Sequence, residues 1–243
     1  MSTINRQLPL YLSAPHPCSY LPGRISSTLF ADPDQAMDMA TYSELLRFGF
    51  RRSGRLVYAP RCQACSQCVP VRVPVDLFTP RRVHRRVLNA NRDIVMREHP
   101  ARFNPEHYAL YKRYTGVRHK DGEMANASPA AYLTFLRADW CETRFFEFHL
   151  GDRLVAVAVT DLPGDGLSAV YTFFDPTLPK RSLGTLAILR QIAHCRALGR
   201  PYLYLGYWIR ESRKMAYKTL FRPVELWRGG RWQRFGHGQG LPD

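Results

Sequence analysis

The chain has 243 residues, of which 45% are hydrophobic and 23% charged, and this composition excludes a disordered, collagen-like or coiled-coil protein. Its 35 Lys and Arg outnumber its 20 Asp and Glu, which gives a formal net charge of +15. Such an excess favours a polyanionic partner, because each phosphate that Arg or Lys neutralises releases counterions. The longest apolar stretch, residues 154–160, is too short to span a membrane, and the N-terminus predicts no signal peptide. We therefore expect a cytoplasmic protein without membrane contact.

The first hundred residues are dense in Pro, Arg and Cys. Residues 8–24 carry four prolines and predict an extended, irregular segment. A helix is expected over 39–48, ended by Gly49 in the C-cap role. Strands are expected over 55–59 and 69–75, so the cysteine cluster between them is predicted to lie on a loop.

Residues 79–100 predict a second helix and a short strand. Thr79 and Pro80 have the N-cap and first-turn signature of a helix that runs to about Arg92, and a strand is expected over 93–97. The Pro-containing segment that follows predicts a domain boundary at about residue 100. Two further helices, each opened by a cap residue and a proline, are expected from 104 and from 128.

The C-terminal half predicts strands around one long helix. Strands over 143–150 and 153–162 flank Gly151-Asp152, a two-residue hairpin signal. A strand over 167–174, an amphipathic helix over 182–198 and a strand over 201–206 follow. This order predicts an α+β protein whose C-terminal domain, residues 101–243, has an N-acetyltransferase-like mixed sheet with a central helix. Residues 1–100 are expected to form a smaller, basic α+β domain that contains the cysteines.

The spacing Cys62-x-x-Cys65-x-x-Cys68 is typical of metal ligands, and Cys18 is the expected fourth thiolate. Thiolates at these spacings suit zinc or an iron–sulfur cluster. A reduced loop without metal, in which the cysteines only pack, is the alternative that the spacing leaves open.

Two groups of residues indicate phosphate contacts. Four arginines on one face of the second predicted helix would repel each other unless a polyanion faces them. The start of the long helix offers free backbone N–H groups, a positive dipole end and a small residue. With no base-reading motif, we expect contact with nucleic-acid phosphates rather than sequence reading, and a solvated basic face is the alternative. These residues are Arg81, Arg82, Arg85, Arg86, Lys180, Arg181, Ser182 and Gly184.

The sequence resembles the arginyl-tRNA–protein transferase family over nearly its whole length. The matching motifs are Gly49-Phe-Arg-Arg-Ser-Gly54 with Tyr58-x-Pro60, Val170-Tyr171-x-Phe-Phe-Asp175-Pro176, and Tyr207-Trp-Ile followed by Ser212 and the stretch from Lys214 to Pro223. The segment from Leu8 to Arg24 is similar to the bacterial branch, whose members are leucyl-tRNA–protein transferases. The resemblance implies transfer of Leu from leucyl-tRNA to proteins with N-terminal Asp or Glu, which marks them for N-degron proteolysis. Leu21 stands where eukaryotic relatives have a cysteine, so a metal site does not carry over directly.

The implied reaction is aminoacyl transfer to an α-amine, for which no cofactor is required. The ester is already activated, so the enzyme must position the amine, remove a proton and stabilise an oxyanion. Asp175 at a strand end is the candidate for orienting or deprotonating the amine, and an Asp-Pro turn is its alternative. Tyr171 is expected on the same face, and Tyr207 is expected to donate toward the oxyanion. Both tyrosines count with Asp175 as catalytic candidates.

An acceptor with N-terminal Asp or Glu also requires a cation for its carboxylate. Lys214 and Lys218 are expected on one helical face, where two aligned ammonium groups indicate an anion, which is either this carboxylate or the tRNA 3′ end. The full candidate set is Arg51, Arg52, Lys214, Lys218 and Arg222. Two other functions remain open from sequence: an arginyltransferase with the same acceptors, and a non-catalytic, metal-dependent nucleic-acid-binding protein.

Overall fold

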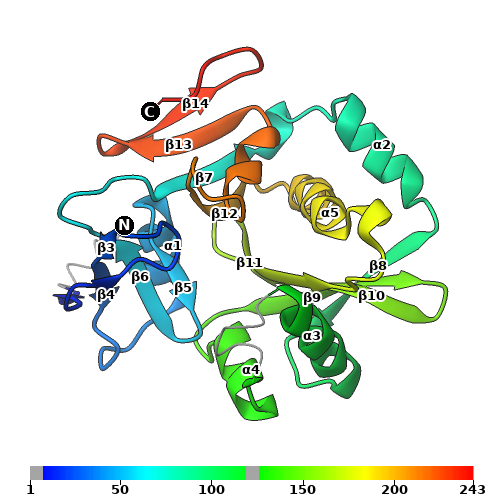
Figure 1. Ribbon diagram of the computed structural model, residues 1–243, viewed down its shortest axis with the longest axis horizontal. Coiled ribbons are helices and arrows are strands. Elements are labelled where there is room, and N and C mark those ends of the chain that lie inside the picture. The colour runs from blue at the N-terminus through cyan, green and yellow to red at the C-terminus, as the bar shows by residue number, and fades with distance from the viewer. Residues whose placement is uncertain (1–7, 119–125, 243) are drawn as a thin grey trace.

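The computed structural model describes residues 8–118 and 126–242 and is built around an eight-stranded mixed sheet (Figure 1). The strands of this sheet are β7 (Val69–Pro74), β8 (Ile94–Pro100), β9 (Thr143–Leu150), β10 (Arg153–Asp161), β11 (Gly166–Phe174), β12 (Tyr202–Trp208), β13 (Val224–Arg228) and β14 (Arg231–Phe235). Their order is β14-β13-β7-β12-β11-β10-β9-β8. The first seven residues, on which the signal-peptide expectation rests, lie outside the described ranges.

Helices cover both faces of this sheet, and they bury its central strands (Figure 1). On one face lie α5 (Leu183–Ala197) and α2 (Arg82–Ala90), and on the other lie α3 (Pro105–Arg118) and α4 (Pro129–Leu136). Strand β10 is buried from its second residue to its last, as its apolar run from Leu154 to Val159 indicates for a strand covered on both faces. The predicted apolar stripe of α5 faces the sheet and includes Leu186, Leu189 and Ile192.

A smaller N-terminal module, residues 8–60, packs beside the large sheet. Its strands are β1 (Leu10–Leu12), β2 (His16–Pro17), β3 (Ile25–Ser26), β4 (Thr28–Ala31), β5 (Arg51–Ser53) and β6 (Leu56–Pro60), and its helix is α1 (Met39–Arg47). Tyr42 and Leu46 of α1 pack in one cluster with Tyr204 of β12. Gly49 follows the C-cap with φ +85°, and a Cβ there would lie 2.6 Å from a side-chain carbon of Pro70. The expected role of Gly49 at the end of this helix is confirmed.

Three helix expectations require correction. Helix α2 begins at Arg82 rather than at Thr79, because the N-cap is Arg81, whose backbone N–H donates to His84 Nδ1. Ser182, the first residue of the helix expected over 182–198, instead precedes α5 in the left-handed conformation, φ 51°, and its side chain makes no capping hydrogen bond. The segment expected to align Lys214 with Lys218 is instead a short 3₁₀ helix, η4 (Ala216–Leu220), which begins after Lys214.

The boundary expected near residue 100 stays a prediction. Strands β7 and β8 precede it, yet β7 pairs with β12 and β13, and β8 pairs with β9. A boundary near residue 100 would fall within the sequence of one sheet, because β7 and β8 precede this residue and the other strands of the large sheet follow it. None of the helices in the described ranges combines the length and apolar character that crossing a membrane requires.

Candidate active site

The parallel strands β11 and β12 separate along their length. They pair from Gly166 opposite Tyr202 to Ser168 opposite Tyr204, and β11 then continues to Phe174 without pairing to β12. The register between β12 and β7 shifts at the same level, between Tyr204 and Gly206. The end of the parallel pairing is therefore a place where side chains from several elements can meet.

Two buried cations meet at this point. Arg51 of β5 donates from Nη1 to Ser168 Oγ at 3.4 Å. Lys218 of η4 donates from Nζ to the Tyr207 carbonyl oxygen at 2.8 Å. Gly206 lies between them: a Cβ there would be 3.3 Å from Lys218 Nζ and 3.7 Å from Arg51 Nη2. Both cations therefore adjoin one glycine at the end of the parallel pairing.

Neither cation has an acidic partner within the described ranges. Arg51 Nη2 is buried and has no hydrogen-bond partner there. Burial lowers the pKa of the Arg51 guanidinium. Burial and the nearby charge of Arg51 lower the pKa of Lys218 to about 7. Two adjacent buried cations repel each other. An anion placed between them would offset this repulsion and would accept a hydrogen bond from Arg51 Nη2.

The neighbouring Arg52 is held inside the protein. Its side chain is fully buried with that of Asp161, and its Nε donates to Asp161 Oδ2 at 2.6 Å. Its remaining N–H groups donate to Thr143 Oγ1 and to the carbonyl oxygens of Leu136 and Gly54. With these donors occupied, the geometry gives Arg52 a structural role rather than the expected role in carboxylate binding.

The other two candidate cations differ from this pair in exposure or in partners. Lys214 is exposed. Arg222 donates from Nη1 to the carbonyl oxygens of Gly236, at 2.7 Å, and Gln239, at 2.6 Å. Of the five expected cations, the structure brings together Arg51 and Lys218.

The hydroxyl groups of the two candidate tyrosines differ in availability. Tyr207 Oη is buried and lies 3.0 Å from the carbonyl oxygen of Gly49 and 3.1 Å from that of Tyr58, so its proton is engaged. Tyr171 Oη is buried and, in the part of the chain that the structure describes, has no hydrogen-bond partner. Its ring lies 6.4 Å from that of Phe173, and both residues belong to the apolar cluster that includes residues of α3 and α4. Tyr171 therefore has the hydroxyl that is free to donate.

Asp175 is buried in a tight turn. Its carboxylate accepts from the backbone N–H of Thr177 at 2.9 Å, from Thr177 Oγ1 at 2.7 Å, and from Arg153. Burial alone would raise the pKa of the Asp175 carboxyl, but these hydrogen bonds outweigh it and hold the pKa below its ordinary value. A carboxylate stabilised in this way is a weak base, so the geometry favours the turn role of Asp175 over proton removal.

The candidate phosphate-binding residues divide into two groups. Arg81, Arg82, Arg85 and Arg86 are all exposed on α2, and Lys180 is exposed near α5. Arg181, however, forms a two-pronged ion pair with Asp93. A Cβ on Gly184 would lie 3.3 Å from the ring of Phe174, so the small size of Gly184 serves packing. The exposed basic surface of α2 is thus the stronger candidate for tRNA contact.

The four candidate metal ligands are free, half-buried thiols. Burial, followed by the charges of Cys62, Cys18 and Cys65, raises the pKa of Cys68 to about 12. Over residues 8–118 and 126–242, no group of three or more His, Cys, Asp or Glu side chains is arranged to hold a metal ion. The expected zinc or iron–sulfur site therefore does not fit this arrangement.

Sequence reasoning did not identify Ser168 or Gly206 as site residues. A glycine inside a predicted strand is a signal for a bulge or a close backbone approach, and Gly206 has φ +86° at the register shift. Ser168 gave no signal, because its role depends on where β5 packs against β11.

Known proteins match this chain over most of its length. Residues 16–86 match the family model for the N terminus of arginine-tRNA-protein transferase, and residues 106–228 match that for its C terminus. An aspartate/glutamate leucyltransferase from Nitrosococcus oceani is 52% identical over 223 residues, covering 91% of this chain and 94% of the relative. One from Alcanivorax borkumensis is 52% identical over 218 residues, covering 90% of each. The crystal structure of FemX is similar in fold, with a TM-score of 0.53, 9% identity, and coverage of 83% and 82%.

Proposed function

The chain belongs to the arginine-tRNA-protein transferase family, and we propose that it transfers leucine from leucyl-tRNA to the α-amine of proteins that begin with Asp or Glu. The names of relatives at about half identity support this donor and these acceptors. The reaction would take place in the cytoplasm, where charged tRNA is available, and would mark its products for N-degron proteolysis.

The Arg51–Lys218 pair is the proposed binding site for the acceptor's side-chain carboxylate. The observation that carries this assignment is the buried Nη2 of Arg51, which has no hydrogen-bond partner among the described residues and lies beside a second buried cation. A carboxylate bridging the two would satisfy this donor and restore the full charge of Lys218, whose pKa burial and Arg51 otherwise lower. An Asn or Gln side chain lacks the charge to do this, which gives the site its preference for acids.

The chemistry requires no covalent enzyme intermediate. The acceptor nitrogen attacks the ester carbonyl carbon, the C–N bond forms, and the C–O bond to the tRNA ribose breaks. The amine loses one proton and the departing ribose oxygen gains one, and an α-amine with a pKa near 7.7–8.0 is partly neutral at pH 7. We assign Tyr171 to stabilising the carbonyl oxygen, because its hydroxyl has no hydrogen-bond partner in residues 8–118 and 126–242. The exposed arginines of α2 are assigned to the tRNA phosphates.

The C-terminal part of the chain is assigned to the N-acetyltransferase-like folds. The crossover from β11 through α5 to the parallel strand β12 supports this assignment, as does the likeness to FemX. In this arrangement the diverging ends of β11 and β12 lie next to the Arg51–Lys218 pair, so acceptor and ester can meet there.

Steady-state transfer of labelled Leu from leucyl-tRNA to an Asp-initiated peptide tests the assignment. Arg51→Met and Lys218→Met should each raise the KM for the peptide at least about tenfold, which corresponds to the free energy of one charge-assisted hydrogen bond. The KM for leucyl-tRNA should stay unchanged. Arg213→Met, an exposed cation near Lys218, is the matched control. A rise confined to the KM for leucyl-tRNA would instead place the tRNA 3′ end at this pair. Parallel reactions with arginyl-tRNA test the donor.

A further inference from the structure

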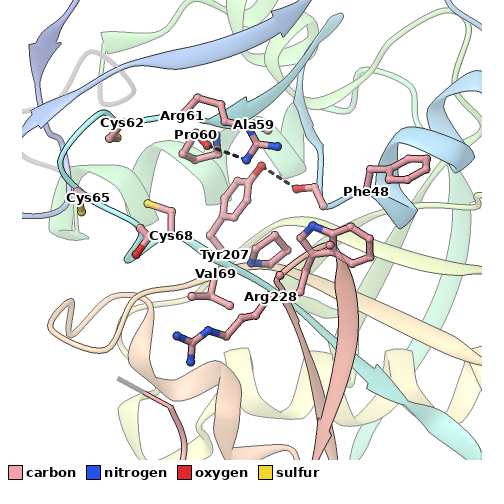
Figure 2. Close-up of a pocket in the computed structure, with 16 residues that line it drawn as sticks. Phe48, Ala59, Pro60, Arg61, Cys62, Cys65, Cys68, Val69, Tyr207 and Arg228 are labelled. Atoms are coloured by element: carbon pink, nitrogen blue, oxygen red, sulfur yellow. Dashed lines mark hydrogen bonds between the residues drawn. The ribbon is translucent and has the colours of Figure 1, made fainter.

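A pocket of about 660 Å³ lies between the N-terminal module, the cysteine loop (residues 61–68) and β13. Figure 2 shows the ring of Tyr207 at its centre, with Cys68 on one side and Phe48 on the other. Pockets of 300–1,000 Å³ enclose drug-sized ligands, which are comparable in size to a short peptide segment. The reaction proposed above uses no part of this pocket, so its occupant is unassigned.

The pocket adjoins the Arg51–Lys218 pair. Tyr207 lines the pocket with its ring, and its carbonyl oxygen accepts from Lys218 Nζ. Gly49, another lining residue, lies two positions before Arg51 in the chain. Cys68 also lines it and is near enough to Lys218 to influence its pKa. A polypeptide whose first side chain sits on the pair has the pocket directly next to it.

The pocket's composition suits a peptide that carries negative charge. Arg61 and Arg228 line it, and none of its described lining residues is acidic. Arg61 is exposed at its edge. Its other walls combine aromatic and proline side chains with the glycines Gly49, Gly229 and Gly230, whose lack of side chains leaves room for a peptide main chain.

We propose that this pocket holds the second and third residues of the acceptor polypeptide and favours an acidic side chain there. The inference rests on the placement of the acceptor's first side chain at Arg51 and Lys218. An extended chain advances about 3.3–3.6 Å per residue, so the residues after the first reach the neighbouring pocket. A tRNA end fits less well, because α2, whose arginines are exposed, packs with α5 on one face of β12, and the N-terminal module packs on the other (Figure 1).

Peptides that begin Asp-Glu, Asp-Ala and Asp-Lys and are otherwise identical test the proposal, with kcat/KM measured at fixed leucyl-tRNA. We expect Asp-Glu to exceed Asp-Lys by about two- to fivefold at low salt, which is the range that partly exposed ion pairs reach. Arg61→Gln should remove most of this preference. Arg55→Gln, an exposed arginine in the β5–β6 turn that does not line the pocket, should leave it intact.

Equal kcat/KM for the three peptides in the wild-type protein would overturn the proposal. So would an Arg61→Gln variant whose defect lies in the KM for leucyl-tRNA, because that result would assign the pocket to RNA. Failure of the underlying site has a different signature. If Arg51 does not read the first side chain, the Arg51→Met variant keeps its preference for Asp-initiated over Asn-initiated peptides, whatever happens at the second position.

Discussion

Replacing Arg52 with Met should destabilise the fold, whereas the same replacement at Arg51 should leave its stability intact. Arg52 and Asp161 form a buried ion pair in which both side chains are fully shielded from solvent. Removing one partner of such a pair leaves an uncompensated charge and costs about 3–5 kcal/mol. Since 1 kcal/mol shifts the melting temperature of a chain this size by about 2–4 °C, Arg52→Met should lower Tm by about 6–20 °C.

Arg51 is equally buried, but its charge has no acidic partner within the described ranges, and its Nη2 makes no hydrogen bond there. Arg51→Met removes an unsatisfied donor and a repulsion with Lys218, so we expect an unchanged or higher Tm together with impaired transfer. Calorimetry of the two variants beside the wild type provides the measurement.

The double variant Arg52→Met/Asp161→Leu is the control for the ion pair. It removes both charges, so it should be more stable than Arg52→Met alone, and the difference measures their coupling. A Tm for Arg51→Met that falls as far as that of Arg52→Met would refute the distinction drawn between the two arginines. An undiminished Tm for Arg52→Met would refute the reasoning about Asp161.

Three further predictions concern individual groups. Because the folded-state pKa of Lys218 is lowered from 10.5 to about 7, the unfolded chain binds the extra proton between these values, so the free energy of unfolding should rise with pH across this window. Lys218→Met should show less of this rise in Tm; an identical pH profile would contradict the buried-lysine interpretation. Gln replacements on α2 at four exposed positions should weaken tRNA binding and reduce the slope of log K against log salt by about 0.7–0.9 for each phosphate that the protein no longer neutralises. The four replaced residues are Arg81, Arg82, Arg85 and Arg86. An unchanged slope would show that α2 does not contact the tRNA. Asp175→Asn should lower the free energy of unfolding by about 1–3 kcal/mol and turnover by less than about tenfold, whereas a loss of 10²–10⁴-fold would restore its role as a base.

The sequence predicted the C-terminal half of the fold well because its signals are local. The hairpin at Gly151-Asp152 joins β9 and β10 as expected, and the long periodic helix became α5 within a residue of its predicted ends. Apart from β6, which was expected over 55–59, the strands of the N-terminal module escaped prediction, since segments of two to four residues carry no clear alternation. Strands β13 and β14 were also missed; they form a hairpin with each other, and β13 in addition pairs with the distant strand β7.

The candidate site was predicted only in part, because residue type is a local signal and the partners of a side chain are not. Residue type identified Arg51 and Lys218 as cations that suit a carboxylate, but it assigned the same role to Arg52 and Arg222. What separates them is tertiary context: Asp161 occupies Arg52, and C-terminal carbonyl oxygens occupy Arg222. The sequence does not show which groups fold against a side chain, whether they lie 14 residues away, as for Arg222 and Gly236, or 109 residues away, as for Arg52 and Asp161.

The interior position of β7 has a consequence for biosynthesis. On one side Pro74 pairs with Tyr202 of β12, and on the other Arg72 pairs with Glu225 of β13. A nascent chain therefore displays β7 with both edges open until nearly the whole protein has left the ribosome. Long-range pairing of this kind is slow, and open strand edges invite association with other chains. Folding is thus expected to be largely post-translational, and truncations that end before β12 should accumulate as aggregates rather than as a folded N-terminal fragment.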